Sequence, residues 1–357
     1  MNSDWKKRMP AEFVYPEAFH NQEIIPSDER SAIDATNQAM IDFFAKAYQN
    51  PQDGKRIVHP KTHGCVRANF ATRPELPDWV KQGVFQPRMV YSAILRFSNA
   101  FPTPRADSEP DSRGLGIQLL NTPGSRLLSS NEDQSGTQDF TMNSFPSFFA
   151  RDAKQYQHFL STVLETGSFT KYMLDTFKNE FTLQPALAIA GIGFVKTSNP
   201  LGQTYFSIAP FTHGNQRNSL LVKQSVTPCG GNWQEGFDKN DPNFMTKLLQ
   251  NHLSQKGACF TFKLQKQTDP TTQPIENLLV RWDENEAPFV DVGTISIQKQ
   301  NILPAAECER LVINPWKGLD VHRPVGGVNR LRKTNYQISV QMRKQLKHGT
   351  VDGRPSN

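Results

Sequence analysis

Short strand-like segments recur along this chain of 357 residues, and they limit the folds that it can adopt. Six of them lie at residues 56–72, 89–99, 114–120, 204–209, 258–265 and 294–299. The 25 prolines and 22 glycines predict many connections between such segments. Strands of similar length that recur in this way favour a barrel or a strongly coiled sheet.

Helical segments accompany the strands. Residues 31–50 have apolar residues near helical spacing, and residues 330–347 have helical periodicity without proline or glycine. A further helix is expected at residues 152–164, with Asp152 as its N-cap. The sequence therefore predicts an α+β chain, with an N-terminal arm and helix at residues 1–50 and one larger domain at residues 51–357 that a C-terminal helix closes.

Composition removes several classes of function. Hydrophobic residues make up 37% and charged residues 21%, which is typical of a globular protein. The net charge is +6, but the basic residues are spread along the chain, which favours a solvated surface over a nucleic-acid site. The longest apolar run, at residues 186–195, is too short to span a bilayer, and the N-terminus has no signal-peptide pattern.

The four cysteines, Cys65, Cys229, Cys259 and Cys308, are far apart and form no Cys-x-x-Cys pair. Zinc and iron–sulfur sites are therefore not expected. Few cysteines in a large chain fit a reducing compartment, so we expect a cytoplasmic protein.

Three side chains near the C-terminus suggest chemistry. Arg332 and Tyr336 are four residues apart, and Arg343 follows seven residues later, which places all three on one face of a helix. One interpretation is a surface helix with solvated arginines. The other is a phenolate, whose pKa an adjacent arginine lowers and which can ligate ferric iron.

The spacing of these three residues resembles the proximal haem-ligand signature of catalases. Other segments resemble catalases in the same chain order. They are residues 56–64 (RIVHPKTHG), 96–98 (RFS) with 113–114 (RG), and 143–152 (NSFPSFFARD). Four ordered matches that span most of the chain are harder to obtain by chance than one.

The resemblance implies an antiparallel β-barrel surrounded by helices, with haem b buried in the barrel. Tyr336 would be the axial ligand of the iron and Arg332 its charge partner. On the distal side, His59 would be the acid–base group, with Asn143 as a hydrogen-bond donor and Ser98 holding the His59 ring. The other residues expected to contact the haem are Arg56, Arg96 and Arg343, through its propionates, and Val58, Phe148 and Tyr156.

A second histidine competes with His59 for the distal position. His63 follows Thr62, and a Thr-His pair resembles the distal pair of coral allene oxide synthase, a catalase relative that acts on fatty-acid hydroperoxides. His59 and His63 have the same parity on a strand, so both are expected to face one side. The choice between them stays open at this point.

The sequence also departs from catalases. Ile338 stands where the proximal signature has an acidic residue, and the chain stops soon after the Tyr336 helix. The resemblance is therefore to a compact, catalase-related subgroup without the C-terminal helical region. Catalases are tetramers held by long arms, and the short arm here leaves a homo-oligomer of unspecified size open.

Three functions fit these residues. The first is an oxidoreductase that disproportionates hydrogen peroxide or reduces it with an organic donor. The second is a haem enzyme that rearranges or cleaves fatty-acid hydroperoxides, which a more open pocket would admit. The third is a barrel that binds haem or lipid without catalysis.

Overall fold

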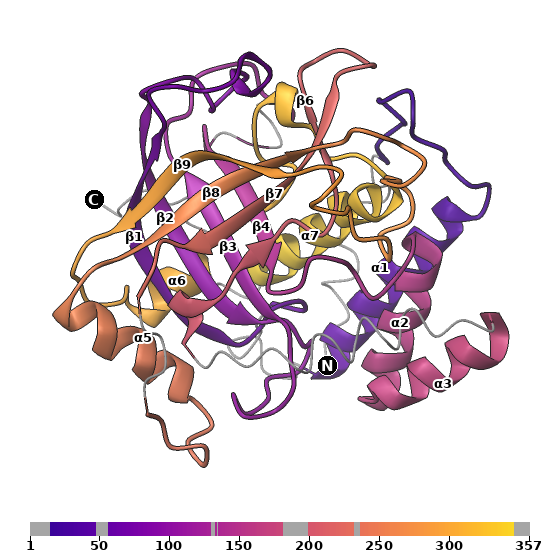
Figure 1. Ribbon diagram of the computed structural model, residues 1–357. Helices are drawn as coiled ribbons and strands as arrows, with labels where there is room; N and C mark the ends of the chain where they lie inside the picture. The colour runs from indigo at the N-terminus through magenta and orange to yellow at the C-terminus, as the bar shows by residue number, and fades with distance from the viewer. Residues whose placement is uncertain are drawn as a thin grey trace.

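The computed structural model describes residues 15–47, 56–129, 133, 135–180, 199–231 and 236–345. In this part of the chain, nine strands form one antiparallel sheet. They are β1 (Thr62–Thr72), β2 (Val90–Asn99), β3 (Arg113–Leu119), β4 (Gln138–Asn143), β5 (Tyr205–Phe206), β6 (Phe211–His213), β7 (Leu220–Pro228), β8 (Ala258–Lys266) and β9 (Phe289–Ile297). The strand order is β5-β4-β3-β2-β1-β9-β8-β7-β6, and pairing of β5 with β7 closes an eight-stranded barrel (Figure 1).

Helices surround the barrel. They are α1 (Glu29–Ala47), α2 (Ala153–Thr166), α3 (Phe169–Glu180), α5 (Phe244–Gln255), α6 (Ala305–Arg310) and α7 (Gly327–Gln345), with short 3-10 turns η3 (Asp78–Val80), η4 (Pro200–Gly202) and η5 (Asp320–His322). Helices α1, α2 and α7 pack together on one side of the barrel, and α3 lies against α2 (Figure 1). Helix α6 lies against β1.

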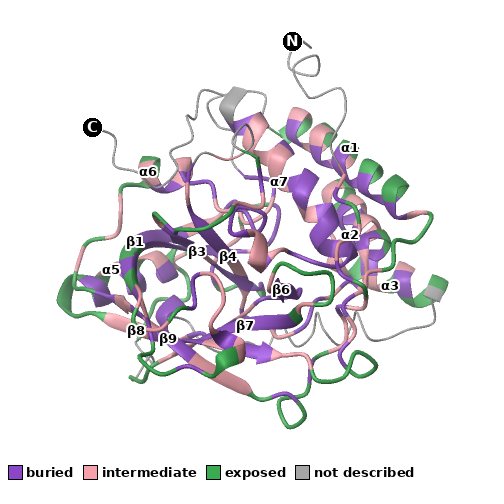
Figure 2. Cartoon of the chain, turned by 90° about the horizontal axis from the view of Figure 1, so that it is seen from above, coloured by how far each residue is buried: buried purple, intermediate pink, exposed green. Residues whose placement is uncertain are grey.

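Strand alternation fills the interior of the barrel. On β2, Leu95 and Phe97 belong to the main apolar cluster, whereas Arg96 and Ser98 belong to the other face. Large aromatic residues such as Phe70, Phe85, Phe140, Phe260 and Phe262 complete that cluster. Figure 2 shows β3 and β4 mostly buried, whereas β8 and β9 alternate between buried and intermediate residues. The barrel interior is therefore a packed core, and Arg96 and Ser98 lie on the outer face of β2.

The predicted α+β barrel is confirmed, and several elements match closely. Helix α2 begins after Asp152, whose carboxylate accepts a hydrogen bond of 2.9 Å from the Gln155 backbone N–H, as the N-cap prediction requires. The first predicted strand was too long, because β1 begins only at Thr62. Strands β4 and β7 and helices α3 and α5 were not predicted. Residues 186–195 and the predicted boundary at residues 50–51 lie outside the described residues.

The cysteines form two disulfides, Cys65–Cys308 and Cys229–Cys259, and none remains free. Cys65 and Cys308 are 243 residues apart in sequence, so their spacing gave no sign of the bond. Disulfides persist mainly in oxidising compartments, which weighs against the reducing compartment expected from cysteine usage. Among the described helices, none combines the length and apolarity needed to cross a membrane.

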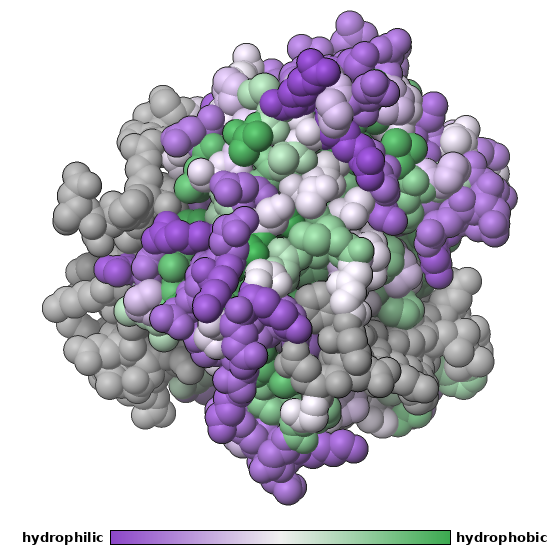
Figure 3. Space-filling model, turned by 60° about the vertical axis from the view of Figure 1, so that its left-hand side comes forward, coloured by the Kyte–Doolittle hydropathy of each residue, from purple (hydrophilic) through white to green (hydrophobic). Residues whose placement is uncertain are grey.

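The surface mixes residue types. On the face in Figure 3, small hydrophobic patches lie between hydrophilic side chains.

Two buried histidines pack against the barrel core. The rings of His213, on β6, and His322, on η5, have centroids 5.3 Å apart, and Phe85 contacts both. His213 Nε2 lies 3.0 Å from the Val80 carbonyl oxygen, and His322 Nε2 accepts from the Val84 N–H. Burial lowers the pKa of His213 to about 4. Burial, together with the charge of His213, lowers the pKa of His322.

We expect the free energy of unfolding to fall as pH decreases from about 6.5 to about 4. In this range the unfolded chain binds a proton on His213 and the folded chain does not, so protons favour unfolding. Each unit of pKa difference corresponds to about 1.4 kcal/mol. Urea denaturation between pH 7 and pH 4.5 measures the slope, which should be smaller in His213→Phe. Equal slopes in the two proteins would contradict this assignment.

Candidate active site

The candidate site is a cavity of about 510 Å³ between the barrel wall and the helices. Its walls come from the segment before β1, from β2, β3 and β4, and from α2, α3 and α7. On the strands, the polar lining residues Arg96, Ser98, Thr141 and Asn143 belong to the outer face. The cavity therefore lies against the outer face of the barrel, because apolar side chains fill the barrel interior.

His59 lies in the bend before β1 and lines this cavity. Its φ of 57° lies in the left-handed region, which non-glycine residues rarely adopt outside functional sites or turns. Its Nδ1 and the Ser98 hydroxyl share a hydrogen bond of 3.0 Å. Gly114 on β3 leaves room for the ring, since a Cβ there would lie 2.3 Å from His59 Nδ1.

The charge state of His59 follows from its surroundings. Burial lowers the pKa of His59 to about 3, and the positive charges of Arg96, Arg332 and Arg56 add to the shift. The imidazole is therefore neutral near pH 7. A neutral ring can accept a proton from a bound ligand.

His63 has different surroundings and is not among the residues that line the cavity. It lies on β1, within the register shift between Thr62 and Gly64. Its Nε2 lies 2.8 Å from Asn99 Oδ1, and its Nδ1 lies 3.7 Å from the buried Asp107 carboxylate. The expectation that both histidines face one side was wrong, because His59 precedes the strand and the shift disrupts the alternation.

Helix α7 contributes the phenol. Tyr336 and Arg332 both line the cavity, with Arg332 Nη2 3.5 Å from the Tyr336 hydroxyl. Arg332 is held by Asn329, whose side-chain oxygen accepts at 3.0 Å, and by the Thr141 hydroxyl on β4. The arginine that the sequence paired with Tyr336 is therefore fixed beside it by Asn329 of the same helix and by Thr141 of β4.

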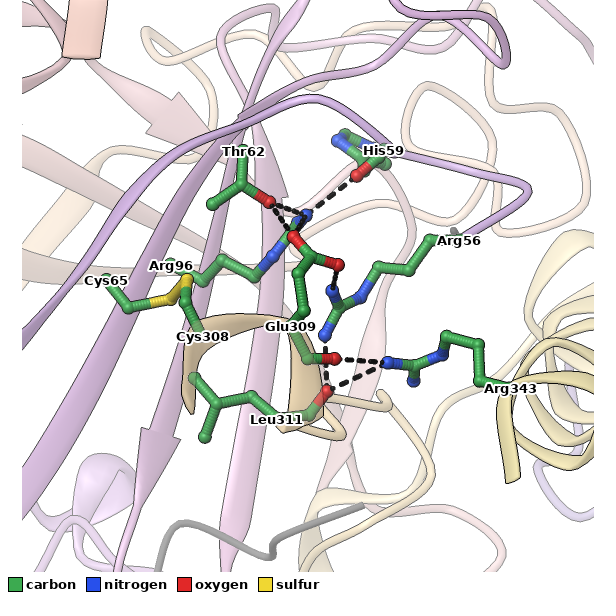
Figure 4. Close-up of a disulfide and its surroundings, with 9 residues drawn as sticks. All are labelled: Arg56, His59, Thr62, Cys65, Arg96, Cys308, Glu309, Leu311 and Arg343. Atoms are coloured by element: carbon green, nitrogen blue, oxygen red, sulfur yellow. Dashed lines mark hydrogen bonds and ion pairs between the residues drawn. A yellow bond between two sulfur atoms is a disulfide. The ribbon is translucent and has the colours of Figure 1, made fainter. Parts of the chain in front are cut away.

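The three arginines expected at the propionates also meet at this cavity. Arg56 comes from before β1, Arg96 from β2 and Arg343 from α7, and all three line it. Figure 4 shows them converging on Glu309 and Leu311, at the end of α6. Arg56 Nη1 lies 2.7 Å from a Glu309 carboxylate oxygen, and Arg343 Nη1 donates to the Glu309 carbonyl at 2.8 Å.

These arginines carry more charge than their partners neutralise. Burial lowers the pKa of Arg96 to about 9, and the charge of Arg56 adds to that shift. Burial raises the pKa of the Glu309 carboxyl, but attraction to Arg56 and Arg96 outweighs it, so the net shift is downward. The Glu309 carboxylate lies within ion-pair distance of Arg56 and Arg96, whereas Arg343 donates to backbone carbonyls, so positive charge exceeds negative charge at this wall.

Unsatisfied donors accompany this excess charge. The Nε atoms of Arg96 and Arg343 are buried and have no hydrogen-bond partner in the described part of the chain. Buried donors without partners are costly, so the wall is suited to an anionic ligand with more than one acceptor group. A group with two carboxylates, such as haem b, fits the charge and the donors.

The remaining predicted residues line the same cavity. The rings of Phe148 and Tyr156 stack with centroids 5.6 Å apart, and Val58 packs against the same apolar cluster. Asn143 ends β4 and pairs with Gly114, the residue beside His59. Burial raises the pKa of Tyr156, so its hydroxyl stays protonated.

Sequence reasoning missed two acidic residues at the site. Glu309 was not predicted. It reaches the arginines in the folded chain, where the neighbouring Cys308 is bonded to Cys65 on the barrel. Asp111 lines the cavity too, and burial raises its pKa to about 6. The sequence did contain a sign of Asp111 at the site, because Asp111 lies two residues before Arg113 in the segment Asp-Ser-Arg-Gly.

Comparison with known proteins identifies the architecture. A fungal catalase aligns with 96% of this chain and 70% of its own, at TM-score 0.62 and 15% identity. A bacterial catalase aligns with 94% of this chain and 64% of its own, at TM-score 0.63 and 18% identity. Catalase A from Saccharomyces cerevisiae aligns with 94% and 68%, at TM-score 0.63 and 15% identity.

This chain has a catalase-like fold. At these identities the likeness concerns the fold. No protein-family model matches the sequence, and no curated protein matches it. The chain spans about two thirds of each of these three catalases.

A substitution at Gly114 tests the packing around His59. In Gly114→Ala the new Cβ would lie 2.3 Å from His59 Nδ1 and 2.8 Å from Ser98 Oγ, so the His59 ring must move. We expect a loss of about 1–3 kcal/mol in the free energy of unfolding, typical of overpacking. Chemical denaturation measures it. Gly236→Ala is the matched control, because nothing lies within 4 Å of its Cβ, and equal effects would contradict the contact.

Proposed function

We propose that this protein binds haem b and acts on peroxides as a catalase-type oxidoreductase. One observation carries the proposal: a single cavity brings together the Arg332–Tyr336 pair, the neutral His59 and three arginines. These arginines, Arg56, Arg96 and Arg343, form the positive wall of the cavity. Each of these features suits a different part of a haem–peroxide site. The catalase-like fold supports the same conclusion.

The chain's own residues would divide the work as follows. Tyr336 would ligate the iron, and Arg332 would stabilise its phenolate form. The three arginines of the positive wall would pair with the haem propionates. Phe148 and Tyr156 would pack against the ring system. Haem, when bound, supplies a redox-active iron that the protein alone lacks.

Proton movement falls to His59. The neutral imidazole would take a proton from one peroxide oxygen and return it to the leaving oxygen, which departs as water. The bond with Ser98 fixes the ring for both transfers, and Asn143 would orient the peroxide without changing its own charge. Over a full cycle, two molecules of hydrogen peroxide give two of water and one of dioxygen.

A second candidate substrate is an organic hydroperoxide, such as that of a fatty acid. The observation in its favour is the apolar part of the cavity wall, formed by Phe149, Phe159, Phe169 and Met173 from α2, α3 and the segment before them. Apolar walls favour an apolar chain over water. Oxygen release from hydrogen peroxide and loss of the conjugated-diene absorbance of a lipid hydroperoxide separate the two substrates.

Replacing the proposed iron ligand tests the cofactor. Purified protein reconstituted with haem should show the Soret band of high-spin ferric haem. In Tyr336→Phe the ring remains but the donor oxygen is gone, so we expect the band to disappear or to shift grossly. Absorption spectra of both proteins at equal haem content measure this. An unchanged spectrum in the variant would refute ligation by Tyr336.

Replacing each histidine in turn tests the proton step. We expect His59→Ala to lower kcat for oxygen release by about 10²–10⁴-fold, as loss of a general acid–base group does. His63→Ala should lower stability, because it removes the buried hydrogen bond between His63 Nε2 and Asn99 Oδ1 and leaves a cavity, while activity per bound haem changes by less than about tenfold. Oxygen-electrode traces on haem-loaded protein measure both. If neither variant loses activity per haem, a non-catalytic haem-binding barrel becomes the better explanation.

A further inference from the structure

The short segment from Glu309 to Leu311 holds two arginines of the positive wall. The Leu311 carbonyl accepts hydrogen bonds from Arg56 and from Arg343, the latter at 3.5 Å. The Glu309 carboxylate pairs with Arg56, accepts from the Thr62 hydroxyl at 2.6 Å and lies 3.9 Å from Arg96. Partners from one three-residue stretch therefore set where the guanidinium groups lie (Figure 4).

Most of this stretch belongs to helix α6, which is too short to be stable without contacts to the rest of the protein. Helix α6 has six residues, well below the length at which an isolated helix is stable in water. Its first residues, Ala305 and Ala306, are exposed. The outward salt bridge from Glu307 to Arg67 is half exposed on the arginine side, and such pairs contribute little.

A covalent bond fixes α6 to the barrel. Cys308 is bonded to Cys65 on β1, and Cys65 is the cross-strand partner of Arg96 on β2. Both sulfur-bearing residues are buried, with Ile94 and Leu311, in a small apolar cluster. One further bond, from the Leu303 N–H to the Cys65 carbonyl at 2.8 Å, leads the chain into the helix. The disulfide therefore lies between the barrel and the residues that hold the arginines.

We propose that the Cys65–Cys308 disulfide is part of the cofactor site: it positions α6 so that Glu309 and Leu311 hold the arginines that receive the haem carboxylates. This inference rests on the proposed function. Glu309 is a positioning residue, and the disulfide fixes it. Neither touches the reacting atoms.

The expected effect follows from electrostatics. When α6 is released, Arg56 and Arg343 lose fixed acceptors while like charges remain beside them, so their side chains move toward water. A ligand carboxylate then has to order them on binding, which weakens binding. The oxidised protein should therefore retain haem longer than protein without this bond.

The chain offers a matched control. The second disulfide, Cys229–Cys259, joins the ends of the neighbouring strands β7 and β8, and neither cysteine lines the cavity. We compare the double variant Cys65→Ala/Cys308→Ala with Cys229→Ala/Cys259→Ala and with wild type. Haem loss from each loaded protein to excess apomyoglobin is followed in the visible spectrum. We expect at least tenfold faster loss from the first variant and less than threefold change in the second.

A double-mutant cycle with Arg343 shows whether the disulfide affects haem binding by positioning the arginines or only through the general stability of the protein. If the disulfide acts through the arginines, removing it in an Arg343→Ala background should change haem loss much less than it does in wild type. Full additivity, or an equal rate of loss in wild type and the Cys65→Ala/Cys308→Ala variant, would overturn the proposal.

A measurement without haem tests separately whether the Cys65–Cys308 bond holds α6 in place, an arrangement that we call the clamp. Hydrogen exchange of the 307, 308 and 311 amides in the haem-free protein should become at least tenfold faster in the Cys65→Ala/Cys308→Ala variant, with barrel amides of β2 unchanged. Unchanged exchange in α6 would refute the clamp even if haem binds. A wild type that takes up no haem would instead refute the proposed function, and the exchange data would still test the clamp.

Discussion

Burial of like charge is the constraint around which this structure is arranged. Arg56, Arg96 and Arg343 share one wall with a single carboxylate, Glu309. Removing an ion from water costs several kcal/mol, and neighbouring ions of the same sign add to that cost. The chain offsets part of it with carbonyl groups at the end of α6. The remaining positive charge favours an anionic ligand more than any apolar one.

The fold explains where such a wall can exist. An eight-stranded barrel is just wide enough for side chains to fill its interior, and here aromatic residues fill it. Polar residues of β2 and β4, among them Arg96, Ser98 and Thr141, face outward into the cavity that helices α2, α3 and α7 also line. The cavity arises because α7 brings Tyr336 and Arg332 to this outer face, held to β4 through Thr141.

Local patterns in the sequence predicted what depends on local structure. Residues 332–343 lie on one helix, so their spacing was enough to place Arg332, Tyr336 and Arg343 together. Strand alternation gave Arg96 and Ser98 the same face. Strand alternation failed to place His59 and His63. The left-handed backbone at His59 and the register shift at His63 depend on tertiary structure, which local patterns do not encode. The Cys65–Cys308 bond spans 243 residues and the Arg56–Glu309 contact spans 253, and no spacing rule encodes either.

The positive wall also determines how His59 can behave. Burial lowers the pKa of His59 to about 3, and Arg96 and Arg56 of the wall, together with Arg332, add to that shift, so a protonated ring releases its proton readily. A dianionic ligand at the wall would offset the excess charge and raise that pKa toward the range in which a histidine both takes and returns protons. Cofactor binding and acid–base chemistry would then be coupled through charge.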